Sequence, residues 1–262
     1  MRRFLGRLRK RIRAILRPEP YRIRTGTHVT PTEVSPLTDD EQAIVDAFHK
    51  LYYEQRVEGR ETVLLSWFGH RILKCPFDIW TYQEIIHETK PELIVECGTR
   101  YGGGALYLAS LLDLRGGPGE VLTIDITAMK HRPIHPRIRY VAGSTLDEAI
   151  VGQVRAAAAG KRTMVILDSD HSAAQVSGEL AIYPEFVSPG CYLIVDDANL
   201  GGHPVLPEHG PGPTEALDAW YPSQTDFVID RSRERFMLSL NPRGFLKRVG
   251  GDAVAGGASP SR

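Results

Sequence analysis

The chain has 262 residues, of which 42% are hydrophobic and 24% are charged, a balance typical of a folded globular protein. Its apolar runs are shorter than the roughly 18 residues that a membrane-spanning helix needs. No continuous apolar run follows the basic N-terminus, so a secretory signal is not expected. The three cysteines are scattered, which disfavours a disulfide framework or a zinc site and indicates a reducing cytoplasm.

The first segment, residues 1–17, holds eight basic side chains and no acidic one, so the remaining chain carries a net charge of −8. At helical spacing its apolar residues share one side and its basic residues lie outside it, a pattern typical of a helix at a membrane interface. We predict contact with an anionic membrane surface at its inner face. Docking on the acidic body, or on a second subunit of a homo-oligomer, is the alternative. Phe4 is the only aromatic residue there, which disfavours nucleic acid as a partner.

Three further regions follow. Residues 18–40 are polar and contain prolines, which predicts a linker. Residues 41–249 form the predicted folded domain, and residues 250–262, small and polar, form a predicted disordered tail.

Within the domain, short apolar runs alternate with helical patterns. Buried strands are expected over 93–96, 121–126, 138–141, 164–167 and 192–195. Helices are expected over 41–53, 80–89, 105–114, 146–159 and 173–186. This alternation predicts an α/β fold with a doubly wound, mostly parallel sheet. Residues 227–230 and 235–240 are expected to form a C-terminal antiparallel hairpin.

The sequence E-C-G-T-R-Y-G-G-G, residues 96–104, follows the first of these strands and opens a helix. Glycines let the backbone turn sharply and approach a ligand, and cofactors of doubly wound folds bind at this turn. A dinucleotide fingerprint would need a glycine at Arg100, whereas an acid at Glu96 suits the cationic methionine end of S-adenosylmethionine. The expected cofactor contacts are Glu96, Gly98, Thr99, Gly102 and Gly103. We expect Gly98→Val to abolish cofactor binding and spare the fold; a turn without a ligand is the alternative.

Later strand ends would complete the cofactor site. Asp125 ends the second strand, where an acid can accept hydrogen bonds from ribose hydroxyls, although aspartate also forms turns. Ser144 follows the third strand, where an adenine would lie, and a simple turn is the alternative. Asp168, after the fourth strand, is expected to contact both the cofactor and a metal ion.

Carboxylates gather after the fourth and fifth strands, in D-S-D-H at 168–171 and D-D at 196–197. If these strands are neighbours, each carboxylate pair about 4 Å apart costs roughly 1–4 kcal/mol, depending on the local dielectric. A divalent cation would offset that repulsion, and its expected ligands are Asp168, Asp196 and Asp197. Asp170 is expected only to start the next helix.

A cation at this edge would lower the pKa of a substrate hydroxyl, and a histidine would then remove the proton. His171 is the expected base, and His203 is the alternative. The acceptor would enter beneath the glycine- and proline-rich segment 201–213, which is suited to act as a lid.

Several blocks resemble a known family. They include W-F-G-H-R-I-L-K-C-P-F-D-I-W-T-Y-Q-E, I-V-E-C-G-T-R-Y-G-G-G-A-L-Y-L-A-S-L-L, V-I-L-D-S-D-H-S, L-I-V-D-D-A-N, G-P-G-P-T-E-A-L and N-P-R-G-F-L-K-R. In this order, over residues 60–249, they resemble the rhamnosyl O-methyltransferase/cephalosporin hydroxylase family. The resemblance implies a Rossmann-like methyltransferase fold that uses S-adenosylmethionine and Mg²⁺, with Asp168, Asp196 and Asp197 as metal ligands. Asp196 stands where the family often has glutamate, and Gly104 where it usually has serine.

The first hypothesis is therefore a Mg²⁺-assisted O-methyltransferase acting on a sugar hydroxyl of a glycolipid or natural-product glycoside. The alternatives are tailoring of another secondary metabolite of the cephalosporin type, a nicotinamide-dependent oxidoreductase, and a non-catalytic binding protein. An iron(II) oxygenase would need a facial triad of two histidines and one carboxylate, which these motifs do not provide.

Overall fold

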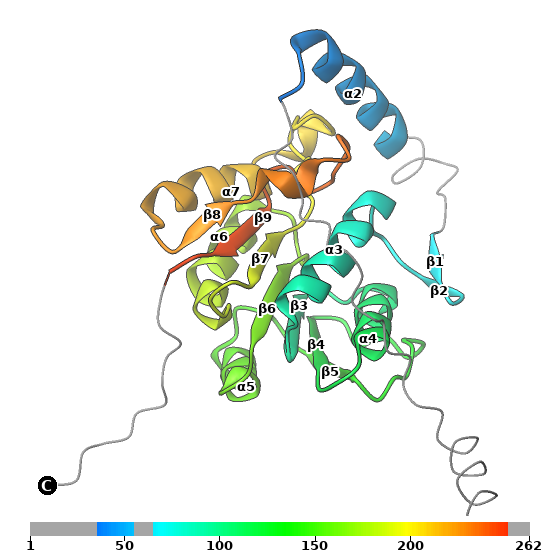
Figure 1. Cartoon of the computed structure of the whole chain (residues 1–262), viewed down its shortest axis with the longest axis vertical. Coiled ribbons are helices and arrows are strands. Elements are labelled where there is room, and N and C mark those ends of the chain that lie inside the picture. Colours follow the sequence, from blue (N-terminus) through cyan, green and yellow to red (C-terminus); the bar gives the residue numbers. More distant parts are fainter. Residues whose placement is uncertain (1–35, 55–64, 251–262) are drawn as a thin grey trace, which may run out of the picture. The chain divides into compact units, whose positions relative to one another are not determined.

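The computed structural model describes residues 36–54 and 65–250, and Figure 1 shows the order of their elements. The predicted N-terminal arm, most of the predicted linker and the predicted tail after Gly250 lie outside the described residues. No helix in the described ranges is long and apolar enough to span a membrane.

Within the described residues, seven strands form the main sheet. In spatial order they are β5 (Ile138–Ala142), β4 (Glu120–Asp125), β3 (Leu93–Cys97), β6 (Thr163–Leu167), β7 (Tyr192–Val195), β9 (Phe245–Arg248) and β8 (Phe227–Ile229). The first five are parallel, and β9 is antiparallel to both β7 and β8. The predicted doubly wound, mostly parallel α/β sheet is confirmed.

The order of the strands also locates a ligand crevice. The chain builds outward from β3 to β4 and β5, then returns across β3 to place β6 on its other side. Ligands of open α/β sheets bind outside the carboxyl ends of the strands at such a switch point.

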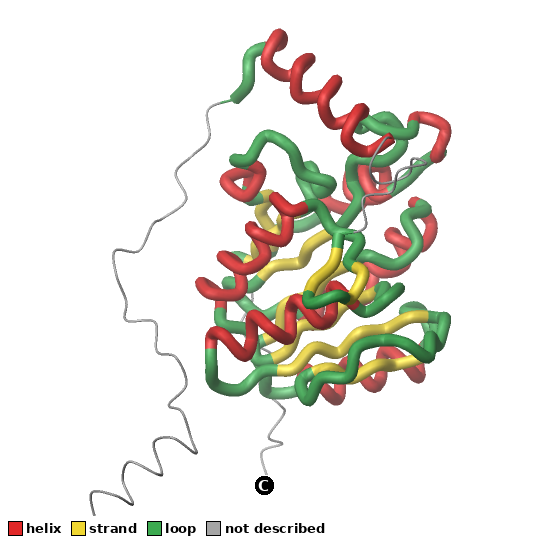
Figure 2. Tube along the Cα trace, turned by 90° about the vertical axis from the view of Figure 1, so that its right-hand side faces the viewer, coloured by secondary structure: helices red, strands yellow, loops and turns green. Residues whose placement is uncertain are grey.

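The central strands consist of continuous apolar runs because helices cover both faces of the sheet, as Figure 2 shows. Every residue of β3, β6 and β7 is buried. Val95 of β3 pairs with Leu122 on one side and Val165 on the other, so the core of the sheet is aliphatic.

The helices flank this sheet. They are α2 (Asp39–Tyr52), α3 (Pro76–Thr89), α4 (Gly103–Arg115), α5 (Glu148–Ala158), α6 (Ala173–Ile182) and α7 (Pro213–Trp220). α2 begins inside the predicted linker because Thr38 and Glu41 form a reciprocal capping box. α3 begins at Pro76 rather than Trp80, since proline is favoured in a first helical turn. A small antiparallel ribbon of β1 (Ser66–Trp67) and β2 (His70–Arg71) precedes α3.

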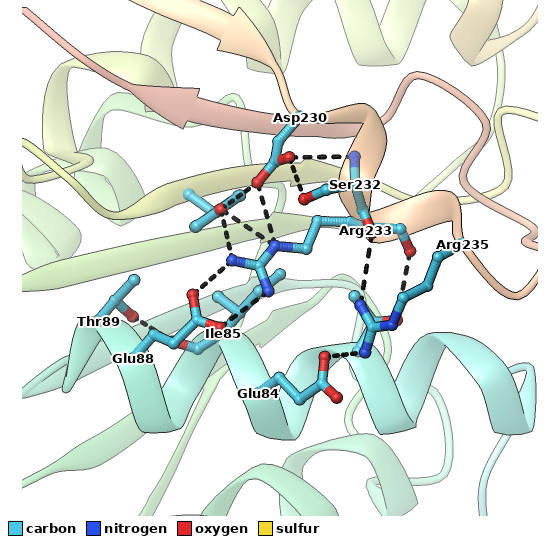
Figure 3. Close-up of polar contacts among 10 residues, drawn as sticks. Glu84, Ile85, Glu88, Thr89, Asp230, Ser232, Arg233 and Arg235 are labelled. Atoms are coloured by element: carbon cyan, nitrogen blue, oxygen red, sulfur yellow. Dashed lines mark hydrogen bonds and ion pairs between the residues drawn. The ribbon is translucent and has the colours of Figure 1, made fainter. Parts of the chain in front are cut away.

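The C-terminal hairpin differs from its prediction. β8 pairs with β9, at Phe245–Arg248, and residues 235–240 form no strand. The preceding residues, Arg231–Glu234, form a 3-10 helix. Figure 3 shows the cause: Arg233 pairs with Glu88 and Arg235 with Glu84, both on α3. These ion pairs direct the segment toward α3 and away from the sheet.

Candidate active site

A cavity of about 640 Å³ lies at the carboxyl ends of the parallel strands, at the switch point of the sheet. Residues from five strand ends line it, namely Gly98, Asp125, Ser144, Asp168 and Asp197. Tyr52 and Tyr53 at the end of α2 line it as well, together with Arg71 and Lys74 from the segment between β2 and α3. Its size falls within the range of small-molecule sites.

The glycines of the first turn are required by the packing of the backbone itself. Gly98 has a φ of +99°, and an added Cβ would lie 1.7 Å from the backbone oxygen of Asp168. An added Cβ at Gly103 would lie 2.0 Å from the backbone oxygen of Arg71. The expectation that Gly98→Val spares the fold is therefore wrong, because the added side chain meets backbone of the next strand.

Glu96 is buried at the end of β3, 1% exposed, and accepts a hydrogen bond from the Thr123 hydroxyl at 2.6 Å. Thr99 joins this chain through a hydroxyl contact of 2.6 Å with Thr123. An added Cβ at Gly104 would lie 2.7 Å from Glu96 Oε1, so the missing side chain leaves room for the carboxylate. Burial raises the pKa of Glu96 to about 7, against the opposing charge of Lys74.

Asp125 supports the glycine-rich turn directly. Its Oδ2 accepts hydrogen bonds from the backbone N–H groups of Thr99 at 3.2 Å and Arg100 at 2.7 Å, and pairs with Arg132 Nη2 at 3.0 Å. Its Oδ1 accepts one from the N–H of Thr127 at 2.7 Å. The structure thus gives Asp125 a supporting role besides the predicted contact with ribose, and it leaves Oδ1 with capacity for a further donor.

Ser144 follows β5 and also lines the cavity. Its Oγ accepts a hydrogen bond from the N–H of Leu146 at 3.2 Å. This contact belongs to a simple turn, which was the alternative to an adenine contact.

Lys74 lies among the carboxylates of the acidic edge. Its ammonium donates to Asp168 Oδ2 at 2.6 Å and also pairs with Asp196. Burial alone would lower the pKa of Lys74, but Asp168, Asp196 and Glu96 outweigh that effect and raise it. Lys74 therefore offsets part of the repulsion between the carboxylates. From the sequence, a metal ion alone was expected to offset it.

The two aspartates after β7 point in different directions. Asp196 is 3% exposed and accepts hydrogen bonds from the Tyr82 hydroxyl and, at 2.7 Å, from Asn241 Nδ2, besides its pair with Lys74. Asp197 lines the cavity, and its backbone, with a φ of +54°, donates to Asn241 Oδ1 at 3.1 Å. Asn241 thus fixes both residues.

A second grouping faces the cavity. Asp168, His171 and Asp197 each offer one ligand atom, and these atoms all lie within 4.8 Å of one another. His171 Nε2 lies 3.2 Å from Asp197 Oδ2. Of the three predicted metal ligands, the structure brings Asp168 and Asp197 together beside His171 and directs Asp196 toward Lys74. Two carboxylates with one imidazole form a donor set that fits a divalent cation.

The remaining sequence candidates lie outside this grouping. Asp170 is exposed, lines the cavity and accepts a hydrogen bond from the N–H of Ser172 at 2.8 Å in a turn, whereas Ser172 itself caps α6. His203 is exposed and pairs with Glu215 Oε1 at 2.8 Å, and it does not line the cavity. His209, from the same predicted lid, does line it.

Sequence reasoning missed the cations of this site, Arg71 and Lys74. Both belong to the block W-F-G-H-R-I-L-K, which carried only a family resemblance. The sequence pattern that could have revealed them is a pair of basic residues just before a helix that packs near the first parallel strand. It also missed Asn241, in the block N-P-R-G-F-L-K-R.

Comparison with known proteins gives a family for the chain. The family model described as Rhamnosyl O-methyltransferase/CmcI matches residues 61–249. The rhamnosyl O-methyltransferase of Mycobacterium tuberculosis is 39% identical over 219 residues, which cover 79% of this chain and 85% of that protein. The Mycobacterium leprae protein of the same name is 38% identical over 215 residues, covering 79% and 91%.

Solved structures agree on the fold. The CmcI-N160 apo-structure aligns with a TM-score of 0.56 at 20% identity, covering 87% of this chain and 91% of that one. The cmcI-D160 Mg-SAM structure aligns with a TM-score of 0.56 at 20% identity, covering 84% and 90%.

Proposed function

The chain belongs to the rhamnosyl O-methyltransferase/CmcI family and is an S-adenosylmethionine-dependent O-methyltransferase, and we propose that its acceptor is a sugar hydroxyl activated beside Mg²⁺. Because the chain belongs to this family, a nicotinamide-dependent oxidoreductase and a non-catalytic binding protein are no longer candidates. The observation that carries the proposal is the grouping of Asp168, His171 and Asp197 inside one cavity at the switch point. The names of the curated relatives favour a rhamnosyl or similar sugar over a cephalosporin-type acceptor.

The cofactor fits the part of the cavity formed by the glycine-rich turn. S-adenosylmethionine supplies a methyl group made electrophilic by its sulfonium. The residues proposed to hold it are Glu96, Gly98, Thr99, Gly102, Gly103, Asp125, Ser144 and Asp168. Gly98 lines the cavity, and Oδ1 of Asp125 can accept a hydrogen bond from a ribose hydroxyl.

The metal ion fits the cavity-facing carboxylates. Bound Mg²⁺ would supply the charge that lowers the pKa of an acceptor hydroxyl. We assign Asp168 and Asp197 as its protein ligands, and Asp196 as a neighbouring residue that stays paired with Lys74. His171 lines the same cavity, with Nε2 3.2 Å from Asp197 Oδ2, and we assign its imidazole as the group that accepts the hydroxyl proton. His203 would need to leave Glu215 and enter the cavity to compete for this role.

A transfer assay tests the function. Labelled methyl groups from S-adenosylmethionine should appear in a rhamnoside, and a rhamnoside with every hydroxyl blocked is the matched negative acceptor. EDTA should abolish the transfer and Mg²⁺ should restore it, whereas Asp197→Asn should remain inactive at any Mg²⁺ concentration, with a loss of at least about 100-fold. Asp147→Asn, at an exposed position that does not line the cavity, is the control and should keep full activity.

Two outcomes would count against separate parts of this proposal. Full activity of the wild type in EDTA would remove the metal from the mechanism. Transfer to other hydroxyl compounds but to no sugar would remove the sugar acceptor and leave the methyltransferase.

A further inference from the structure

Arg71 ends β2 and reaches the cavity beside the glycine-rich turn. Its Nη1 donates to the Tyr101 hydroxyl at 3.2 Å, and its Cζ lies 4.6 Å from the centroid of the Tyr101 ring. It lines both the main cavity and a small pocket that contains Glu96, Gly98 and Gly103. Tyr101 therefore holds a guanidinium in a fixed position next to the turn that is proposed to bind the cofactor.

Several N–H donors of the Arg71 guanidinium are available for a further acceptor. Arg71 Nε is buried and has no hydrogen-bond partner, and within residues 36–54 and 65–250 no carboxylate forms an ion pair with Arg71. By contrast, Arg132 pairs with Asp125, and Arg233 pairs with Glu88. A buried donor without an acceptor costs free energy, so an arginine in this state at a cavity wall is suited to bind an anion.

The neighbouring charges identify the anion. Two other cations lie at this wall: Lys74 is already engaged by Asp168 and Asp196, whereas Arg100 is exposed. Glu96 and Arg71 line the same small pocket, together with Lys74, Asp168 and Arg100. Because Lys74 and Asp168 pair with each other, the carboxylate of Glu96 and the guanidinium of Arg71 remain as a pair of opposite charges. An amino-acid end, with one carboxylate and one ammonium, matches this pair of charges, whereas a neutral sugar does not require them.

We propose that Arg71 binds the carboxylate of the methionine moiety of S-adenosylmethionine through its guanidinium. The inference rests on the proposed function only in taking S-adenosylmethionine as the cofactor. Arg71 is thus a determinant of cofactor specificity, because its donors require the carboxylate that distinguishes this cofactor from its decarboxylated form. A guanidinium suits the task better than an ammonium because its planar fork matches a carboxylate.

Calorimetric titration without acceptor tests this assignment. The wild type is titrated with S-adenosylmethionine and with decarboxylated S-adenosylmethionine, which differ only in the carboxylate. Arg71→Met should weaken binding of the first roughly tenfold to 100-fold and leave the affinity for the second unchanged. Arg71→Lys should recover part of the loss. Arg139→Met, which removes an exposed arginine of β5 that lines neither pocket, is the matched control and should preserve the preference.

The ratio of the two affinities decides the outcome, so a general loss of folding does not imitate the expected result. Equal weakening of both ligands by Arg71→Met, or no change in either, would overturn the inference while leaving the cofactor in place. A wild type that binds neither ligand would overturn the cofactor assignment itself, and this inference with it.

Discussion

Lys74 contacts two carboxylates of the acidic edge and lies near that of Glu96. Its charge and theirs stabilise one another, because each would be costly to bury alone. Asp196 depends on this arrangement most, since only 3% of it is exposed. The internal cation therefore stabilises part of this edge without a metal ion, and the proposed Mg²⁺ is needed chiefly to activate the acceptor hydroxyl.

Removing that cation should destabilise the protein. Lys74→Met should lower the free energy of unfolding by about 3 kcal/mol, because Asp196 is left buried without its counter-charge. Urea denaturation without Mg²⁺ measures the change, and Lys50→Met, on an exposed position of α2, is the control. Adding Asp196→Asn to Lys74→Met should recover part of the loss. An unfolding midpoint equal to that of the wild type would contradict the argument.

The sequence predicted that carboxylates converge, because parallel strands deliver their ends to one edge. It did not predict how Asp196 and Asp197 divide their roles. That division depends on the left-handed backbone of Asp197 and on partners distant in sequence, Lys74 and Asn241. Neither partner leaves a local pattern, so only the folded chain reveals which aspartate faces the cavity.

At the scale of elements, α2 contributes Tyr52 and Tyr53 to the cavity and is attached through His49. His49 is buried, 4% exposed, and its Nε2 lies 3.0 Å from Asn199 Nδ2. Since an amide nitrogen only donates, the ring nitrogen accepts, and the imidazole is neutral. Burial lowers the pKa of His49 to about 4, although Asp46 opposes the shift.

Acid should therefore weaken the docking of α2. Between pH 6.5 and about 4 the unfolded chain binds a proton at His49 and the folded chain does not, so stability falls as the pH falls. The loss in the free energy of unfolding reaches about 3 kcal/mol near pH 4, and it is absent well above pH 6.5. Urea denaturation across this range measures it: His49→Gln should flatten the profile, and exposed His131→Gln should not. Identical profiles for wild type and His49→Gln would refute this account.

The hairpin shows where local pattern is misleading. Residues 235–240 alternate in a strand-like way, yet Leu238 and Leu240 join a separate apolar cluster with Tyr53 and Cys75. Asp78 of α3 holds this segment by accepting hydrogen bonds from Ser239 Oγ at 2.6 Å and from the N–H of Leu240 at 2.8 Å. Together with the arginine pairs of Figure 3, these long-range contacts override the propensity of the segment.

At the scale of the whole molecule, the sheet was the most predictable feature. Its buried strands read as uninterrupted apolar runs, such as Tyr192–Val195, and right-handed crossovers leave few ways to order them. The exact bounds of α3 and the partner of β8 were less predictable, because a proline in the first turn and distant ion pairs decide them.

The charge of the whole chain is divided between a cationic arm, residues 1–17, and an acidic body. Residues 1–17 lie outside the described residues, and their membrane contact stays a prediction. The body carries a net charge of −8, so an anionic surface should repel it and attract the arm, with each basic residue contributing about 1 kcal/mol. The full chain should therefore sediment with anionic vesicles at low salt and dissociate at high salt.

A charge variant isolates this contribution without shortening the chain. Replacing Arg3, Arg7, Arg9 and Arg13 by glutamine keeps the apolar residues and should remove about half of the attraction, which reduces sedimentation several-fold at moderate salt. Neutral vesicles are the control and should retain neither protein. Equal sedimentation of wild type and variant with anionic vesicles would rule out an electrostatic attachment. In that case the arm would be assigned to a contact with the acidic body or with a second copy, which equilibrium ultracentrifugation distinguishes by mass.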